Sequence, residues 1–396
     1  MKQRAWTAVV AGLMLLSLLA AKGGCGSGFG SGNSPTPTPT GTGSASSFLY
    51  VTNFGDGTVS MLSRNPSSGA LAFLSNAKAG AALGPSGLAV HPNNSLVYVA
   101  NQADGNVYGF SVNTSAGTLT ATAQVSVNDG TNSQPQQLAF GANGSFLYVA
   151  NRGVLGVLAG SISEYAVDAA SGKLTSLGTV TTGLISPVSI AANPAQTMVY
   201  VCDNGLGIVT AFSVGSSGSL TKAASALSLG VATGQPNAVA VDPSGKFVYV
   251  ADATTGQVAA FNAAPSSGAL AFLASYPTAV PPLPPDSHVI VPAQVGSSDF
   301  VYLSDNLGGM VWFSPQTGNS GDPLSLFTAT SVGLVAPMGL AVDSTGGFLY
   351  AANNAGGSIT VFSLSSSNGV PTYSATYATE STLNVNAAPV WIALSH

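Results

Sequence analysis

A five-residue phrase recurs seven times along this chain and constrains the fold more than any other feature. Each copy begins with an aliphatic residue and a tyrosine and ends on Asn or Asp; the copies span 49–53, 97–101, 147–151, 199–203, 248–252, 301–305 and 349–353. Their last residues lie 48 to 53 positions apart. A period of about 50 residues is typical of repeat architectures, in which each repeat is one supersecondary unit. The chain is therefore expected to fold as a set of similar units.

One full copy, residues 85–125, shows what such a unit contains. Four short segments rich in Val, Leu, Tyr, Phe or Thr are separated by turn sequences, among them 91–94 and Asp104-Gly105. These segments predict β-strands, and Asp-Gly turns favour antiparallel hairpins. A four-stranded sheet with apolar residues on both faces cannot bury them alone, so the copies should pack face to face around an axis. The pattern predicts an all-β fold, a β-propeller with four-stranded antiparallel blades.

The two ends of the repeat region complement each other. The chain opens on a second strand at Phe48, with no first strand before it, and ends on a first strand at 389–394, with no second strand after it. We therefore predict a seven-bladed β-propeller over residues 48–396, closed by the C-terminal strand completing the first blade. Closure removes the exposed strand edges of an open array. The alternative, a linear solenoid, would need atypical capping repeats, and none is visible in the sequence.

Low charge limits the partners that the chain can have. Charged residues make up 6% of the sequence and the net charge is −5, against 45% hydrophobic residues. Such a surface offers nothing to a polyanion, so nucleic acid is not an expected partner. Outside the N-terminal region the single cysteine is Cys202, which occupies the place of Ala100, Ala150 and Ala251 in other copies. We interpret Cys202 as a small buried core residue rather than a reactive thiol.

The N-terminus has the features of an export signal. Lys2 and Arg4 precede an apolar run from Ala5 to Ala21, which is shorter than a membrane-spanning helix needs. Lys22-Gly23-Gly24-Cys25 then resembles a bacterial lipobox, although Lys22 stands where an aliphatic residue is usual. Residues 1–25 are thus predicted to be a signal peptide with lipidation at Cys25. Cleavage near Ala21 without a lipid, or an uncleaved anchor, are the alternatives.

Residues 26–47 consist almost entirely of Gly, Ser, Thr, Pro and Asn. Too little apolar surface is available here to offset the entropy of ordering, so the segment is predicted to be a disordered tether. With a lipid on Cys25, it would hold the propeller close to a membrane in the bacterial periplasm or at the cell surface.

The repeats, of which 242–250 is the clearest example, resemble those of the seven-bladed propellers of the lactonase and YVTN-repeat group. The resemblance covers roughly residues 48–396. The group includes enzymes similar to 6-phosphogluconolactonase and to the carboxymuconate cyclases. It implies a propeller and, in catalytic members, lactone hydrolysis. Because one fold hosts many functions, the repeat identifies the fold better than the reaction.

The resemblance also implies functional positions, which this chain fills only in part. Catalytic members tend to have Pro-Arg-His at the start of an inner strand and Asn-Arg-Gly-His after a second strand. Here the corresponding residues are Pro135-Gln136-Gln137 and Asn151-Arg152-Gly153-Val154, so only Arg152 carries over. Hydrolysis would then use Arg152 with His288 and Glu164 in an altered arrangement. His288 is the only histidine expected at a channel mouth, since His91 lies at the far end of an inner strand and His396 is terminal.

A ligand face is predicted where the chain enters each inner strand. The residues that follow the first-strand proline should encircle the axial opening, and they are Ser86, Gln136, Val188, Asn237, Ser287, Met338 and Val390, with Gln137, His288 and Trp391 one step further. We expect Gln136, Gln137, Asn237, Asp286 and Trp391 to contact a ligand. The ring is rich in amides and poor in charge, which suits a small neutral ligand, a glycan or a protein surface.

The Asn or Asp that ends each second strand is interpreted as a turn-making residue, because such side chains commonly bond to nearby backbone. No metal site and no cofactor are expected: the sequence has neither a calcium-loop spacing nor a His/Cys cluster. No Gly-x-Ser-x-Gly nucleophile motif occurs in a strand-to-helix context either.

Three hypotheses for function remain at this point. The first is a membrane-tethered propeller that recognises a ligand or a protein without catalysis. The second is a lactone hydrolase of the resembled family. The third is a cell-surface lattice or adhesion protein that associates through its outer strand edges.

Overall fold

The computed structural model describes residues 47–126, 132–223, 227–228, 234–264, 266–278, 287–305, 309–315, 324–380, 384 and 386–395. The predicted leader, Cys25 and nearly all of the predicted tether lie outside the described residues. Within the described part of the chain, no helix is long and apolar enough to cross a membrane.

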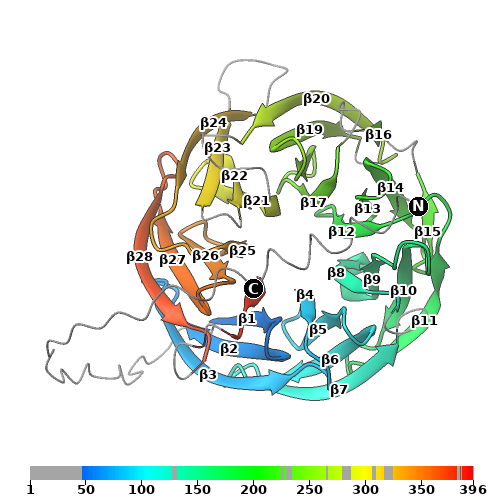
Figure 1. Cartoon of the computed structure of the whole chain (residues 1–396), viewed down its shortest axis with the longest axis horizontal. Helices are drawn as coiled ribbons and strands as arrows, with labels where there is room; N and C mark the ends of the chain where they lie inside the picture. The colour runs from blue at the N-terminus through cyan, green and yellow to red at the C-terminus, as the bar shows by residue number, and fades with distance from the viewer. Residues whose placement is uncertain are drawn as a thin grey trace, which may run out of the picture. The chain divides into compact units, whose positions relative to one another are not determined.

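The described strands form seven sheets arranged around a central axis (Figure 1). In chain order we name them blade 1 (β29-β1-β2-β3), blade 2 (β4 to β7), blade 3 (β8 to β11), blade 4 (β12 to β16), blade 5 (β17 to β20), blade 6 (β21 to β24) and blade 7 (β25 to β28). Every pairing between neighbouring strands is antiparallel, as the hairpin turns predict. The described residues include the short 3₁₀ turn η2 (Ala142–Gly144) and contain no α-helix.

The innermost strands are β29 (Pro389–Leu394), β4 (Pro85–Val90), β8 (Pro135–Gly141), β12 (Pro187–Ala192), β17 (Pro236–Val241), β21 (Ser287–Val295) and β25 (Pro337–Val342). The second strands are β1 (Ser47–Asn53), β5 (Leu96–Asn101), β9 (Phe146–Asn151), β13 (Met198–Asp203), β18 (Phe247–Asp252), β22 (Ser298–Asp305) and β26 (Phe348–Asn353). These are the strands that carry the repeated phrase.

The third strands are β2 (Thr58–Arg64), β6 (Asn106–Val112), β10 (Ser161–Val167), β14 (Ile208–Val214), β19 (Gln257–Ala263), β23 (Gly309–Pro315) and β27 (Ser358–Leu364). The outer strands are β3 (Leu71–Lys78), β7 (Leu119–Ser126), β11 (Leu174–Val180), β15 (Leu220–Lys222) with β16 (Leu227–Ser228), β20 (Leu270–Pro277), β24 (Leu324–Thr330) and β28 (Pro371–Ala378).

Blade 1 is completed by the two ends of the propeller. Strand β29 pairs antiparallel with β1, in a register that sets Leu49 opposite Leu394 and Val51 opposite Ile392. The backbone N–H of Phe48 also donates to the Ser395 hydroxyl at 2.8 Å. The predicted closure is thus confirmed, and the solenoid alternative is wrong.

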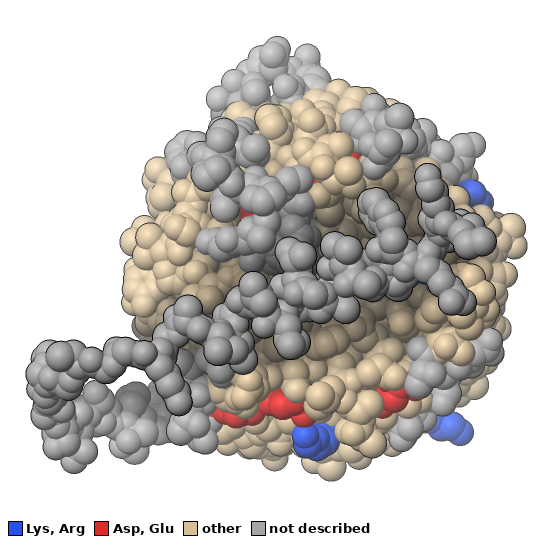
Figure 2. All heavy atoms as spheres, in the orientation of Figure 1, with Lys and Arg blue, Asp and Glu red and all other residues tan. Residues whose placement is uncertain are grey.

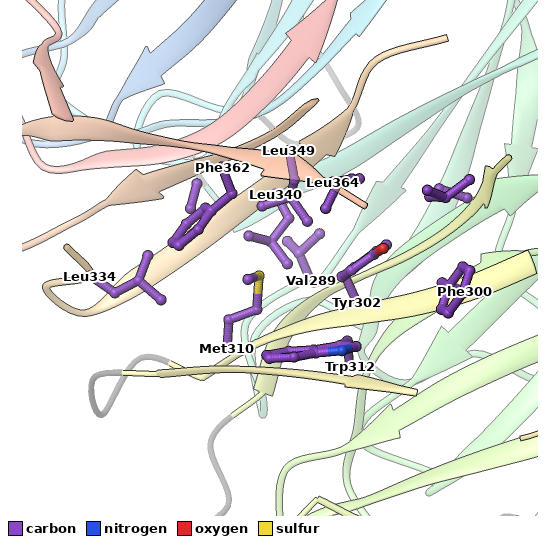
Figure 3. Close-up of a cluster of buried hydrophobic side chains, with 13 residues drawn as sticks. Val289, Phe300, Tyr302, Met310, Trp312, Leu334, Leu340, Leu349, Phe362 and Leu364 are labelled. Carbon is purple, nitrogen blue, oxygen red and sulfur yellow. The ribbon is translucent and has the colours of Figure 1, made fainter. Parts of the chain in front are cut away.

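Burial explains why the second strands have no polar face. Strands β5 and β13 are buried at every residue, whereas every residue of the outer strand β11 after Leu174 is exposed or half-buried. A second strand lies between two neighbouring blades, so both of its faces must be apolar. Figure 3 shows one interblade core, where Tyr302 and Trp312 of blade 6 and Phe362 of blade 7 pack with ten other buried residues.

Candidate functional site

Two rings of residues line a cavity of about 540 Å³ at one end of the axis. The first ring comes from the inner strands and contains six of the seven positions predicted from the sequence: Ser86, Gln136, Val188, Asn237, Met338 and Val390. Gln137 and Trp391, one residue further along their strands, also line it. These residues therefore line the axial opening as expected, while ligand binding at this face and the binding roles of Gln136, Gln137, Asn237 and Trp391 stay predictions.

The second ring consists of the residues that follow the repeated phrase: Phe54, Gln102, Arg152, Asn204 and Ala253. Each is fixed by its backbone N–H, which donates to the carbonyl of the residue before the inner-strand proline; for Arg152 the acceptor is Gln134, at 3.1 Å. Sequence reasoning identified only Arg152 in this ring. The signal that would have found the others is their place directly after the Asn or Asp of the phrase.

Close approach of the inner strands keeps the cavity narrow. A Cβ on Gly87 would lie 2.4 Å from the carbonyl oxygen of Gln136, and one on Gly339 would lie 2.9 Å from that of Val390. Because backbone atoms cannot move aside as a flexible side chain can, only glycine fits at these two positions. Both glycines stand two residues after the strand proline, so the sequence holds the inner ends of neighbouring blades together at the axis.

Arg152 is the one charged residue among the described residues that line the cavity. Its side chain is exposed, and its guanidinium forms no hydrogen bond or ion pair with the described part of the chain. An unpaired guanidinium offers several N–H donors in a fixed plane to a carbonyl or carboxylate. Figure 2 shows only scattered Lys, Arg, Asp and Glu side chains on the drawn face, in keeping with the low charge of the sequence.

The two glutamines of blade 3 have different surroundings. Gln136 donates its Nε2 to Gln102 Oε1 at 2.7 Å, which joins two amides of neighbouring blades at the cavity wall. Gln137 accepts at Oε1 from the Ser189 hydroxyl (2.6 Å) and from the backbone N–H of Ile190 (3.1 Å). Gln137 therefore ties blade 3 to blade 4, which leaves only its amide nitrogen for a ligand.

The structure does not bring Glu164 to Arg152. Glu164 lies in β10, does not line the cavity, and is 5% exposed. Its Oε1 accepts the backbone N–H of Leu220 in blade 4 at 2.6 Å. Burial raises the pKa of this carboxyl above its ordinary value, and the Leu220 hydrogen bond only partly opposes the rise. Grouping Glu164 with Arg152 was wrong because side chains of a third strand point between blades rather than into the axial opening.

The structure describes the other predicted site residues only in part or not at all. His288 lies in β21, of which the neighbouring Val289 lines the cavity, but the side chains of Ser287 and His288 are not described. Asp286, Cys25 and His396 lie outside the described residues.

The side chains of the Asn and Asp residues that end the second strands bond in two ways, some to backbone N–H groups of nearby turns, as predicted, and others to hydroxyls of the third strand. Asn151 donates to the Ser161 and Ser163 hydroxyls, while Asp203 accepts from the backbone N–H groups of Ile185, Ser186 and Leu206. Cys202 is fully buried, as predicted, and its thiol contacts the Ala238 carbonyl of the next blade at 3.7 Å.

His91 is buried at the opposite end of its inner strand, 3.2 Å from the Gly144 carbonyl oxygen and edge-on to Phe140. Its predicted structural role agrees with these contacts.

Comparison with known families gives the same architecture. Residues 45–234 match the family described as "Lactonase, 7-bladed beta-propeller". The chain is a seven-bladed propeller, and over residues 45–234 it is similar to the lactonase-type propellers. No curated protein matches it.

Solved structures with this fold resemble the propeller at low sequence identity. A candidate 6-phosphogluconolactonase from Bacteroides uniformis is 16% identical, with a TM-score of 0.74 over 89% of this chain and 100% of that chain. The periplasmic gluconolactonase PpgL of Pseudomonas aeruginosa is 18% identical, with a TM-score of 0.72 over 89% of this chain and 99% of that chain. At these identities the likeness concerns the fold.

Proposed function

We propose that the protein is a lactonase that hydrolyses an uncharged lactone in the axial cavity. The observation that carries this proposal is the unpaired Arg152 guanidinium, held on a lactonase-type propeller at the wall of a cavity of about 540 Å³. A cavity of this volume is ample for one small ring ester.

In the proposed reaction, Arg152 donates hydrogen bonds to the carbonyl oxygen of the lactone. Water adds to the carbonyl carbon, and negative charge develops on the oxygen that faces the guanidinium. The bond between that carbon and the ring oxygen then breaks, the ring oxygen takes up the proton that the added water gives up, and the product is the open hydroxy acid. Donors aimed at the developing oxyanion lower the barrier because they stabilise the transition state more than the ground state. Amides such as Gln102, Asn204 and Asn237 orient the rest of the ring.

Charge argues for an uncharged rather than a phosphorylated substrate. Phosphate recognition normally uses several cations or convergent backbone N–H donors. The described cavity lining supplies one cation, and Arg152 is already engaged with the ester in this proposal.

The test is hydrolysis of a panel of γ- and δ-lactones by the purified protein, with phosphorylated and unphosphorylated members compared. Arg152→Ala should lower kcat/KM for an uncharged lactone by roughly 10²- to 10³-fold, the usual effect of losing an oxyanion donor. Lys246→Ala is the matched control, because Lys246 is an exposed cation in the turn after β17, at the opposite end of the inner strands from Arg152. Turnover unaffected by Arg152→Ala, or no turnover on any lactone, would refute the proposal.

A second candidate function is recognition without catalysis, in which the propeller binds a neutral ligand or a protein at the same cavity. One observation favours it: the described lining contains no carboxylate or imidazole that could move a proton near neutral pH. Saturable binding of lactones without hydrolysis by the wild-type protein would support this candidate over the first.

We also propose that the propeller works outside the cytoplasm, attached by lipid to Cys25. The support is the charged and apolar leader of residues 2–21 and the small residues before Cys25. Cys25→Ala should move the protein from the membrane fraction to the soluble exported fraction. An unchanged distribution, or a mature N-terminus without acyl groups by mass spectrometry, would contradict lipid attachment.

A further inference from the structure

The side chains that line the axial cavity are mostly polar on one side of the ring and apolar on the other. Blades 2 to 5 contribute hydrogen-bonding side chains, chiefly Gln102, Gln136, Arg152, Asn204, Gln235 and Asn237. The described lining from blades 6, 7 and 1 is apolar and consists of Val289, Met338, Val390, Trp391 and Phe54. The cavity therefore has a polar wall and an apolar wall that face each other across the axis.

The two walls differ at equivalent positions of the repeat. The residue after the inner-strand proline is Gln136 in blade 3 and Asn237 in blade 5, whereas it is Met338 in blade 7. The residue after the second-strand phrase is Arg152 in blade 3 and Phe54 in blade 1. Because the backbone positions are the same, the asymmetry lies in the side chains rather than in loop length. Val188 is the one large apolar residue within the polar wall.

Trp391 gives the apolar wall a fixed surface. It is half-buried and packs against the interblade core that contains Leu340 and also against the core that contains Leu88, so both neighbouring blades hold it. Strand β25 also lies close to Trp391, since a Cβ added to Gly339 would be 3.0 Å from the Trp391 Cα. This close approach further limits the movement of Trp391. Aromatic side chains held in this way offer a large contact area at little entropic cost.

We propose that the substrate is an amphipathic lactone, whose ring ester faces Arg152 and whose aromatic or short alkyl substituent lies against Trp391 and Met338. This inference rests on the proposed lactonase function. A fully hydroxylated sugar lactone would turn several hydroxyl groups toward the apolar wall, where the Trp391 indole N–H is the only strong hydrogen-bonding group on the described side chains, and unpaired polar groups weaken binding strongly. An apolar substituent instead removes the same wall from water.

Binding of lactams tests this inference separately from hydrolysis, since a ring amide resembles the ester but is not turned over. We would compare a phenyl-substituted δ-lactam with a polyhydroxylated δ-lactam by calorimetry on the purified protein. The phenyl lactam should bind at least about tenfold more tightly, the order of selectivity that an apolar contact supplies.

Two valines at equivalent positions provide a matched pair of variants. Val390 and Val188 both follow an inner-strand proline, the first in the apolar wall and the second in the polar wall. Val390→Thr should weaken the phenyl lactam about three- to tenfold, and Met338→Gln should act in the same direction. Val188→Thr, the same chemical change across the axis, should leave phenyl-lactam affinity within twofold.

The outcomes distinguish the two proposals. Equal or tighter binding of the hydroxylated lactam, binding of neither lactam, or equal sensitivity to Val390→Thr and Val188→Thr would overturn the amphipathic substrate, whatever the hydrolysis assay shows. Phenyl-lactam preference with the predicted variant pattern, but without hydrolysis of any lactone, would support the amphipathic ligand class and refute the lactonase function.

Discussion

Glycines in the turn between the third and outer strands let a ring of the preceding blade lie directly against the backbone. Gly117 has φ +71°, and a Cβ there would lie 2.1 Å from the ring of Phe48; Gly218 stands in the same relation to Phe146, and Gly369 to Phe300. Positive φ and lack of space coincide at these residues. The contact joins neighbouring blades through the residue two positions before the repeated tyrosine.

Gly117→Ala tests whether the contact with Phe48 adds to the cost of placing a side chain at a positive φ. We expect a loss of about 2 to 3 kcal/mol of unfolding free energy, from a positive φ combined with overpacking. The matched control is Gly156→Ala, at φ +81° with no atom within 4 Å of an added Cβ, which should cost only about 1 kcal/mol. Urea unfolding measures both, and equal losses would show that Phe48 contributes nothing.

Glu164 gives a prediction about pH. Its carboxyl pKa is raised by burial, so the folded protein holds a proton that the unfolded chain has released, and stability falls as pH rises above the ordinary carboxyl pKa of about 4.5. Glu164→Gln keeps an oxygen acceptor for Leu220 and removes the charge. We expect the variant to melt at a higher temperature than the wild type at pH 7 and at nearly the same temperature at pH 4. A melting difference that does not vary with pH would contradict this.

Among the strands, the tyrosines of several second strands reach across to the next blade. Tyr98, Tyr148 and Tyr302 donate their hydroxyls to the carbonyls of Gly172, Gly218 and Gly369 at 2.7 to 3.0 Å. Each acceptor glycine lies in the turn before an outer strand. In these blades the tyrosine ring fills the core and the tyrosine hydroxyl bonds to the neighbouring blade. The hydroxyl bond explains why phenylalanine does not stand at this position in these blades.

Tyr148→Phe and Tyr200→Phe form a matched pair for this connection. Both tyrosines are fully buried, but the Tyr200 hydroxyl has no hydrogen-bond partner among the described residues. Tyr148→Phe should lose about 1 kcal/mol or more, because the Gly218 carbonyl is left unsatisfied, while Tyr200→Phe should be close to neutral. Equal effects in denaturant unfolding would show that the interblade hydrogen bond adds no stability.

The strands could be predicted from the repeat in the sequence, but the side-chain contacts between the strands could not. The period gave the strands, the blade number and the pairing of β29 with β1, since each follows from spacing and alternation. Cavity residues that follow the inner-strand prolines were found in the same way. Phe54, Gln102 and Asn204 were missed although they hold the same place in the repeat as Arg152, because Arg152 was selected through the family resemblance and not through that place. Glu164 was misplaced because the position of a residue in the sequence does not by itself give the direction of its side chain.

In the molecule as a whole, a buried ion pair joins blade 7 to blade 1, the blade that the two ends of the propeller complete. Arg64 of β2 donates from Nη1 to Asp343 Oδ2 at 2.9 Å, and both side chains are nearly inaccessible to solvent. Arg64 also donates from Nε to the Ser47 hydroxyl at the start of β1. It is the one ion pair between side chains of the described residues, and its arginine lies on the blade that β29 closes by pairing with β1.

Arg64→Met should destabilise the propeller by about 3 to 5 kcal/mol, because it leaves the Asp343 carboxylate buried without its cation. The double variant Arg64→Met/Asp343→Asn removes both charges and should recover a large part of that loss. Denaturant unfolding of the wild type and both variants measures the difference. A double variant as unstable as the single one would mean that the charge of Asp343 is not the cause.

We propose that the closed ring presents a lactone to Arg152 at its axis. A crystal structure of the protein with a bound phenyl-substituted δ-lactam would show whether it does. We expect the lactam carbonyl oxygen within about 3 Å of an Arg152 guanidinium nitrogen, with the phenyl group against Trp391. A lactam bound outside the axial cavity, or inside it with the carbonyl turned away from Arg152, would refute this role of Arg152.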